Sequence, residues 1–178
     1  AHGYARIRGL TALMLRDITL VAAQAEADAE RFRALGAPRV QVTGNLKYDM
    51  PLPATLPEQG RALRRDVLGA NRPVWIAAST HSGEDEQILD AFAILRARWP
   101  DLLLMLAPRH PERFDSVAAL CRQRGFAAVR RSEQQPCTPD SAVFIGDSMG
   151  ELLQFYAAAD LAFVGGSLVA TGGHNVLE

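Results

Sequence analysis

The chain has 178 residues, of which 48% are hydrophobic and 22% charged. This length and composition are typical of a soluble globular protein in the one-domain range that can bury a core. The net charge of −1 argues against nucleic acid as a partner, because nucleic-acid-binding domains usually carry a basic excess or a basic stripe. No apolar run approaches the roughly 20 residues of a membrane span.

The first 45 residues predict a strand, a helix and a second strand. Apolar residues at helical spacing over 6–16 indicate a preceding helix, with Ile7, Leu10, Leu13 and Met14 on one stripe. A strand is expected over 18–23, a helix over 25–35 that ends at Gly36, and a strand over 40–45. This order predicts a parallel crossover unit.

The segment from 50 to 60 contains Pro51, Pro53 and Pro57, which interrupt any regular pattern. We interpret it as a linker and place a domain boundary there. The chain begins at Ala1 without an initiator Met, inside a helix-like stretch, and stops at Glu178 in what should be the first turns of a helix. We therefore expect it to be a piece of a longer protein.

Four apolar strands are expected beyond the linker, over 73–78, 102–106, 142–145 and 160–164, and residues 126–130 could form another. Amphipathic helices follow the first two of these strands, and a further helix opens after Gly146; Ser82 with Asp85, and Ser148 with Glu151, have capping-box spacing. Alternating strands and helices predict a Rossmann-like parallel sheet with flanking helices. Each of the four strands ends in a polar loop, so these loops should meet at the carboxyl edge of the sheet, where ligands bind in such folds.

The last of these loops is rich in glycine. Gly172 and Gly173 would let a ligand approach main-chain N–H groups, and a helix start there would favour an anionic group. His174 or Asn175 shares a helix face with Glu178, whose carboxylate could accept bonds from sugar hydroxyls. A plain glycine-rich connection between strand and helix explains the spacing equally well.

Metal and thiol chemistry are not indicated. Cys121 falls in an apolar helical pattern and Cys137 in a loop, so we expect two free thiols and a reducing compartment. No Asp-x-Asp signature follows a strand and no His/Cys cluster has ligand spacing, so we expect no resident metal and no cofactor.

Several motifs in order resemble the bacterial 3-deoxy-D-manno-octulosonic acid (Kdo) transferases of lipopolysaccharide synthesis. They span nearly the whole chain and comprise residues 43–49 (TGNLKYD), 78–81 (ASTH) with Glu84, 107–113 (APRHPER), 150–152 (GEL) with 156–160 (YAAAD), and 172–175 (GGHN) with 177–178 (LE). The resemblance implies the C-terminal lobe of a GT-B glycosyltransferase. Residues 1–50 would be the tail of the N-terminal (acceptor) lobe with the interlobe segment. Residues 51–178 would be a C-terminal nucleotide-sugar-binding lobe, truncated at its end.

The implied activity is transfer of Kdo from CMP-Kdo to a lipid A precursor, lipid IVA, in inner-core synthesis. The family's catalytic base lies outside this chain, so we expect no catalytic residue within it and no transfer by this piece alone. The CMP-Kdo-binding residues would be Pro108, Arg109, His110, Ser148, Met149, Gly150, Gly172, Gly173, Asn175 and Glu178. Ser79, Thr80, His81 and Lys47 would contact the sugar or the interlobe region.

Each role has a simpler interpretation. Arg109 could hold phosphate or carboxylate bidentately or form a surface ion pair, and Ser148 could contact the ligand or only cap a helix. The resemblance places the parent protein at the cytoplasmic face of the inner membrane, with CMP-Kdo and a lipid A precursor as partners, whereas this piece should be soluble and its oligomeric state is open. Another GT-B enzyme that uses a UDP-sugar, a transferase or epimerase, and a non-catalytic α/β binding domain are the alternative functions.

Overall fold

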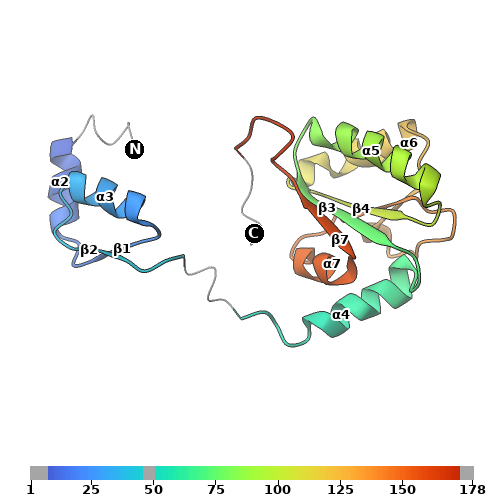
Figure 1. Ribbon diagram of the computed structural model, residues 1–178, viewed down its shortest axis with the longest axis horizontal. Helices are drawn as coiled ribbons and strands as arrows, with labels where there is room; N and C mark the ends of the chain where they lie inside the picture. The colour runs from blue at the N-terminus through green and yellow to red at the C-terminus, as the bar shows by residue number, and fades with distance from the viewer. Residues whose placement is uncertain (1–7, 46–50, 173–178) are drawn as a thin grey trace. The chain divides into compact units, whose positions relative to one another are not determined.

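The computed structural model of the chain describes residues 8–45 and 51–172 (Figure 1). The chain divides into two compact units, with the division after Pro51. The first unit contains α2 (Arg8–Arg16), β1 (Val21–Ala23), α3 (Glu26–Ala34) and β2 (Val40–Val42). β1 and β2 pair in parallel, with Val21 opposite Val40, so the predicted strand–helix–strand crossover is confirmed. Gly36 follows α3 with a φ of +97°, the left-handed conformation expected just past a helix end.

The first predicted helix is confirmed as α2, and the described residues of its apolar stripe are exposed. Leu10, Leu13 and Met14 are 59%, 64% and 64% exposed, whereas Leu15 is buried. Within residues 8–45 the sheet is built from two strands of three residues each, which covers little apolar surface. Helical spacing shows which side chains share a face. Whether that face is buried depends on how much sheet or helix surface lies next to it.

The second unit is built around a five-stranded sheet in the order β5-β6-β4-β3-β7. Every neighbouring pair is parallel, as predicted. Its elements are, in chain order, α4 (Leu56–Leu63), the π-helical turn η2 (Arg64–Leu68), β3 (Val74–Thr80), α5 (Glu84–Arg98), β4 (Leu103–Pro108), the 3-10 turn η3 (Pro111–Arg113), α6 (Phe114–Gln123), β5 (Ala128–Arg130), the 3-10 turn η4 (Arg131–Glu133), β6 (Val143–Ile145), α7 (Leu152–Ala158) and β7 (Leu161–Val164).

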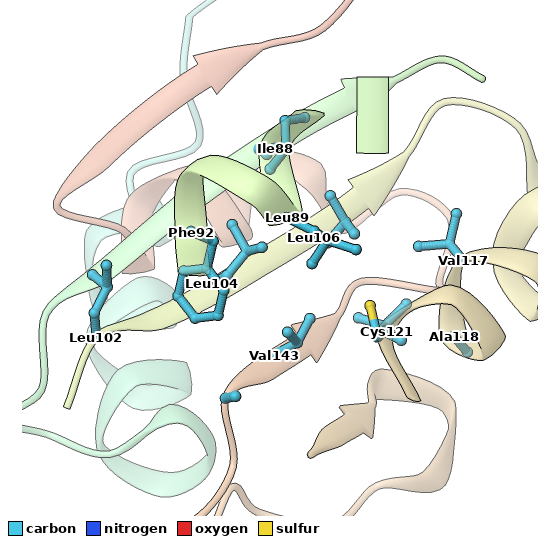
Figure 2. Packing of buried hydrophobic residues seen from close by; sticks show 13 residues of the cluster. Ile88, Leu89, Phe92, Leu102, Leu104, Leu106, Val117, Ala118, Cys121 and Val143 are labelled. Atoms are coloured by element: carbon cyan, nitrogen blue, oxygen red, sulfur yellow. The ribbon is translucent and has the colours of Figure 1, made fainter. Parts of the chain in front are cut away.

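Two apolar clusters cover opposite faces of this sheet. The side chains of β4 alternate between them, because successive residues of a strand point to opposite faces. Leu104 and Leu106 pack with α5 and α6 in the first cluster, much of which is drawn in Figure 2, and Leu103 and Met105 pack with α4 and α7 in the second. The unit is therefore a three-layer α/β/α arrangement with β4 buried at its centre, and α5 and α6 lie on the face opposite α4 and α7 (Figure 1).

The segment predicted to be a linker is partly helical, which corrects that interpretation. α4 begins at Leu56 and places Pro57 in its first turn, where the missing N–H of proline has no helical partner to lose. Gly60 of α4 packs so closely on α7 that an added Cβ would lie 2.6 Å from the carbonyl oxygen of Ala157. The proline cluster therefore marks the start of a packed helix.

The amino edge of the same sheet is held by one arginine. Arg72, just before β3, donates hydrogen bonds to the carbonyl oxygens of Asp101 at 3.0 Å, Thr138 at 3.3 Å and Ser141 at 2.7 Å. These carbonyls lie in the segments that lead into β4 and β6. A single side chain thus joins the starts of three neighbouring strands.

Candidate functional site

The connections that leave β4 and β6 diverge to opposite faces of the sheet. β4 continues into η3 and α6 on one face, whereas β6 continues into α7 on the other. Between two neighbouring parallel strands this divergence opens a crevice at their carboxyl ends, the position at which open α/β sheets bind ligands. A cavity of about 600 Å³ lies there, lined by Pro108–Pro111 after β4 and by Gly146 and Ser148–Gly150 after β6.

Most of the predicted ligand-binding residues that the structure describes line this one cavity. They are Pro108, Arg109, His110, Ser148, Met149 and Gly150, and Ser79 from the end of β3 joins them. Arg109, His110 and Met149 are exposed, and Ser148 is half-buried. The sequence prediction that separate polar loops meet at the carboxyl edge is therefore confirmed for the loops after β3, β4 and β6.

The other predicted residues lie elsewhere or outside the described part. Thr80 is buried, and its hydroxyl donates to Asp85 at 2.6 Å, so it serves the packing of the strand end. His81 stands edge-to-face against His110, with ring centroids 5.7 Å apart. Gly172 is exposed, with a φ of +93°. The remaining predicted residues, Lys47, Gly173, Asn175 and Glu178, lie outside the described residues, as does His174.

The wall of the cavity depends on Gly146. A Cβ at this position would lie 2.7 Å from the ring of Phe155 and 3.3 Å from the Cβ of Ala107. Phe155 belongs to α7, is 1% exposed and also stacks edge-on against Phe144 of β6. Glycine therefore lets the aromatic ring pack directly beneath the loop that carries Ser148.

Ser148 is held in place by the ion pair between Glu151 and Arg131. Its hydroxyl donates to the carboxylate of Glu151, which in turn accepts two bonds from Arg131, from Nη2 at 2.8 Å and from Nε at 3.1 Å. Hydrogen bonding to Arg131 is the main reason that the pKa of Glu151 lies below its ordinary value, so this carboxylate is ionised and can only accept. The predicted capping box is wrong, because Ser148 bonds the Glu151 side chain and Glu151 itself is the residue before the first turn of α7.

Asp147, the neighbour of Ser148, is fixed by a second set of bonds. Its carboxylate accepts from Ser132 through the backbone N–H at 2.9 Å and the hydroxyl at 2.6 Å, and from Nε of Arg130 at 2.7 Å. Burial opposes ionisation of Asp147, but these donors outweigh it and hold its pKa below the ordinary value. The loop after β6 is therefore tied to η4 at two consecutive positions.

The end of β3 is tied to η3, the turn before α6, by Asp85. This buried carboxylate accepts from the Thr80 hydroxyl and pairs with Arg113, whose Nη1 also donates to the Thr80 carbonyl at 2.6 Å. Burial is the largest influence on Asp85 and raises its pKa, and its partners only partly offset that effect. Asp85 was predicted to cap α5 with Ser82, and this prediction is wrong, since the residue before the helix is Gly83 with a φ of +90°.

Ser79 has a strained backbone at the cavity wall. Its φ of +55° lies in the left-handed region, which non-glycine residues rarely adopt and which is often found at functional sites. Gly165, just after β7, packs against it, because a Cβ there would lie 2.3 Å from the Ser79 carbonyl oxygen. The tight contact joins the loops that follow β3 and β7.

Sequence patterns missed the residues that hold these loops, namely Arg113, Arg130, Arg131 and the acidic partners that pair with them. Their partners lie 17 to 28 positions away in the chain, so no local spacing marks the pairs. The available signal was the position of each acidic residue directly after an apolar strand or its loop. That signal was interpreted as helix capping for Asp85 and Glu151.

The described residues offer neither a metal site nor a reactive thiol. Over residues 8–45 and 51–172, no group of three or more His, Cys, Asp or Glu side chains could hold a metal ion. Cys121 and Cys137 are both free, as predicted, and burial raises their pKa values to about 12 and about 11. No helix within the same described ranges is long and apolar enough to cross a membrane.

A doubly covered parallel sheet with a ligand-sized crevice at its carboxyl edge defines a Rossmann-like lobe, the class found in GT-B glycosyltransferases. Residues 1–50 match the family described as 3-deoxy-D-manno-octulosonic-acid transferase (kdotransferase). A 3-deoxy-D-manno-octulosonic acid transferase of Haemophilus influenzae is 46% identical over 100% of this chain and 42% of its own length. The Bordetella pertussis enzyme of the same name is 41% identical over 92% of this chain and 39% of its own length.

The similarity extends to solved structures. The crystal structure of the C-terminal CMP-Kdo binding domain of WaaA from Acinetobacter baumannii matches with a TM-score of 0.64 and 38% sequence identity, over 70% of this chain and 65% of that one. The predicted fold class and the resemblance to the Kdo transferases are therefore confirmed. The chain spans about two fifths of the length of the curated relatives it matches.

Proposed function

We propose that this chain is part of a Kdo transferase and that its second unit holds the sugar-nucleotide donor CMP-Kdo. The observation that carries the proposal is the cavity between the loops after β4 and β6, which gathers six predicted donor-binding residues in a domain whose solved relative is a CMP-Kdo binding domain. In this proposal residues 1–50 form the tail of the acceptor lobe. Residues 51–178 form the nucleotide-sugar lobe.

Arg109 is the residue best suited to bind the charged part of the donor. It lies at the cavity, directly after the buried strand β4. A guanidinium binds phosphate or carboxylate through two parallel hydrogen bonds, and CMP-Kdo carries both groups. The positive charge would also stabilise the negative charge that develops on the departing CMP.

We further propose that the complete enzyme transfers Kdo to a lipid A precursor at the inner membrane and does so without a resident metal or cofactor. The basis is the family resemblance, together with the lack of an Asp-x-Asp sequence after any strand. The chain described here would bind the donor and transfer nothing, because the general base of the family lies outside it. Gly172, Gly173, Asn175 and Glu178 would add contacts to the same nucleotide.

Calorimetry with CMP tests the donor site. We expect Arg109→Ala to weaken CMP binding about 10-fold or more, because a charge-assisted hydrogen bond is worth about 1.5–3 kcal/mol. Arg122→Ala is the matched control, because Arg122 is an exposed arginine on α6 and does not line the cavity. Equal affinity of wild type and Arg109→Ala would refute the site, and tighter binding of UDP than of CMP would favour a UDP-sugar enzyme.

A further inference from the structure

Glu84, the first residue of α5, is a fully buried acid, and its side-chain partners among the described residues are backbone N–H groups of nearby loops. Its carboxylate accepts from Gly166 at 2.8 Å, Ser167 at 3.0 Å and Leu168 at 2.9 Å, and from His81 at 2.9 Å. The first three donors are consecutive and lie 82 to 84 positions further along the chain. One side chain therefore joins the loop after β3 to the glycine-rich loop after β7.

Three consecutive N–H groups that converge on one point form a backbone nest, an arrangement that binds anions such as phosphate. Gly166 has a φ of +83°, which is part of the turn that points these groups inward. A glycine-rich loop at the carboxyl edge is where sequence reasoning expects a ligand phosphate. Here the anion in the nest formed by residues 166–168 comes from the protein itself.

The Glu84 carboxylate is suited to remain charged in this position. Burial opposes its ionisation, but the four backbone donors outweigh burial and keep its pKa below the ordinary value. An ionised carboxylate has lone pairs for all four N–H donors. A neutral acid or an amide carries an O–H or N–H group of its own, which would face one of these donors without forming a hydrogen bond.

The bonds of Glu84 control the position of residues close to the cavity. Gly165 immediately precedes the nest and packs on the backbone of Ser79, which lines the cavity. On the other side of the nest the chain continues to Gly172, where the predicted ligand-binding segment begins. Release of the 166–168 loop would therefore alter both the cavity wall and the start of that segment.

We propose that Glu84 is a positioning residue of the donor site, which fills the nest at residues 166–168 so that the phosphate of the nucleotide binds at the loops after β4 and β6. The inference rests on the proposed function for its ligand. That the Glu84 carboxylate holds the loop of residues 166–168 does not depend on which nucleotide binds.

The test removes the carboxylate and supplies a small anion in its place. In Glu84→Ala we expect amide hydrogen exchange of Gly166, Ser167 and Leu168 to accelerate about 10-fold or more, and CMP affinity in calorimetry to fall about 10-fold. Added formate should restore both, because it can enter the vacated nest. Glu86→Gln is the matched control, since Glu86 lies on the same helix turn but is exposed, and it should change neither measurement.

Glu84→Gln serves if the alanine variant does not fold, because it keeps the volume and one acceptor. It should accelerate exchange of the same three amides and weaken CMP, without a response to formate. Unchanged protection of residues 166–168, unchanged CMP affinity in a folded variant, or failure of formate to act on Glu84→Ala would each overturn the proposal. Absence of CMP binding by the wild type would refute both the proposed function and the positioning role. Even then, the effect of formate on amide exchange of residues 166–168 in Glu84→Ala would decide whether Glu84 fills the nest.

Discussion

Gly165→Ala should separate the ends of β7 and β3. The added Cβ would lie 2.3 Å from the Ser79 carbonyl oxygen and 2.8 Å from the Cα of Thr80, whereas ordinary contacts begin at 3.4 Å. The neighbour is backbone, so the strand end must move by about 1 Å, and overpacking of this kind costs about 1–3 kcal/mol. The bond from the Gly165 N–H to the Ala78 carbonyl, 2.8 Å long, should weaken at a further cost of about 1 kcal/mol.

We therefore expect Gly165→Ala to lower the free energy of unfolding of the second unit by about 2–4 kcal/mol. Urea unfolding followed by tryptophan fluorescence measures it selectively, because Trp75 and Trp99, the two tryptophans of the chain, both lie in this unit. Leu161→Ala is the control on the same strand, since Leu161 is 65% exposed and should change the free energy by less than about 0.5 kcal/mol. A Gly165→Ala variant as stable as that control would refute the close contact and the reasoning from it.

Two further predictions concern the loop after β6. Ser148→Ala should weaken CMP about 5-fold, because the hydroxyl donates its hydrogen to the ionised Glu151 and so can accept a hydrogen bond from the ligand. Calorimetry with CMP and UMP checks this, and unaltered CMP affinity would contradict it. Asp147→Asn should lower the free energy of unfolding by about 1.5–3 kcal/mol at neutral pH. Since the pKa of Asp147 is lowered on folding, its contribution is present above the unfolded pKa of about 4 and is lost as the pH falls through the folded value. Urea unfolding from pH 7 to pH 2 should therefore show a shallower acid loss in Asp147→Asn than in wild type, and parallel curves would contradict the assignment.

The arrangement of the sheet could be predicted because each strand carries its own signal. Residues 103–106 form an unbroken apolar run, which is typical of a strand covered on both faces, and the structure buries β4 throughout. Parallel strands place their carboxyl ends at one edge, so the meeting of Arg109 and Ser148 at one cavity follows from the order of elements. Local sequence was sufficient for both conclusions.

The bonds that hold the loops could not be predicted in the same way. Glu84 contacts a loop more than 80 positions away, and Arg131 reaches Glu151 across an intervening strand, so neither pair has a local spacing that would reveal it. Capping rules correctly place acidic residues near helix starts. They did not distinguish a carboxylate that accepts hydrogen bonds from the N–H groups of its own helix from one that binds a neighbouring segment. Only the tertiary structure makes this distinction.

The three-carbonyl contact of Arg72 has a consequence for how this lobe tolerates change. It secures the strands at the amino edge, whereas the ligand cavity opens at the carboxyl edge. Loops at the cavity can thus be lengthened or exchanged to accept a different sugar nucleotide while the opposite edge keeps strand register intact. Engineering of donor preference should accordingly begin at the loops after β4 and β6 and leave the surroundings of Arg72 untouched.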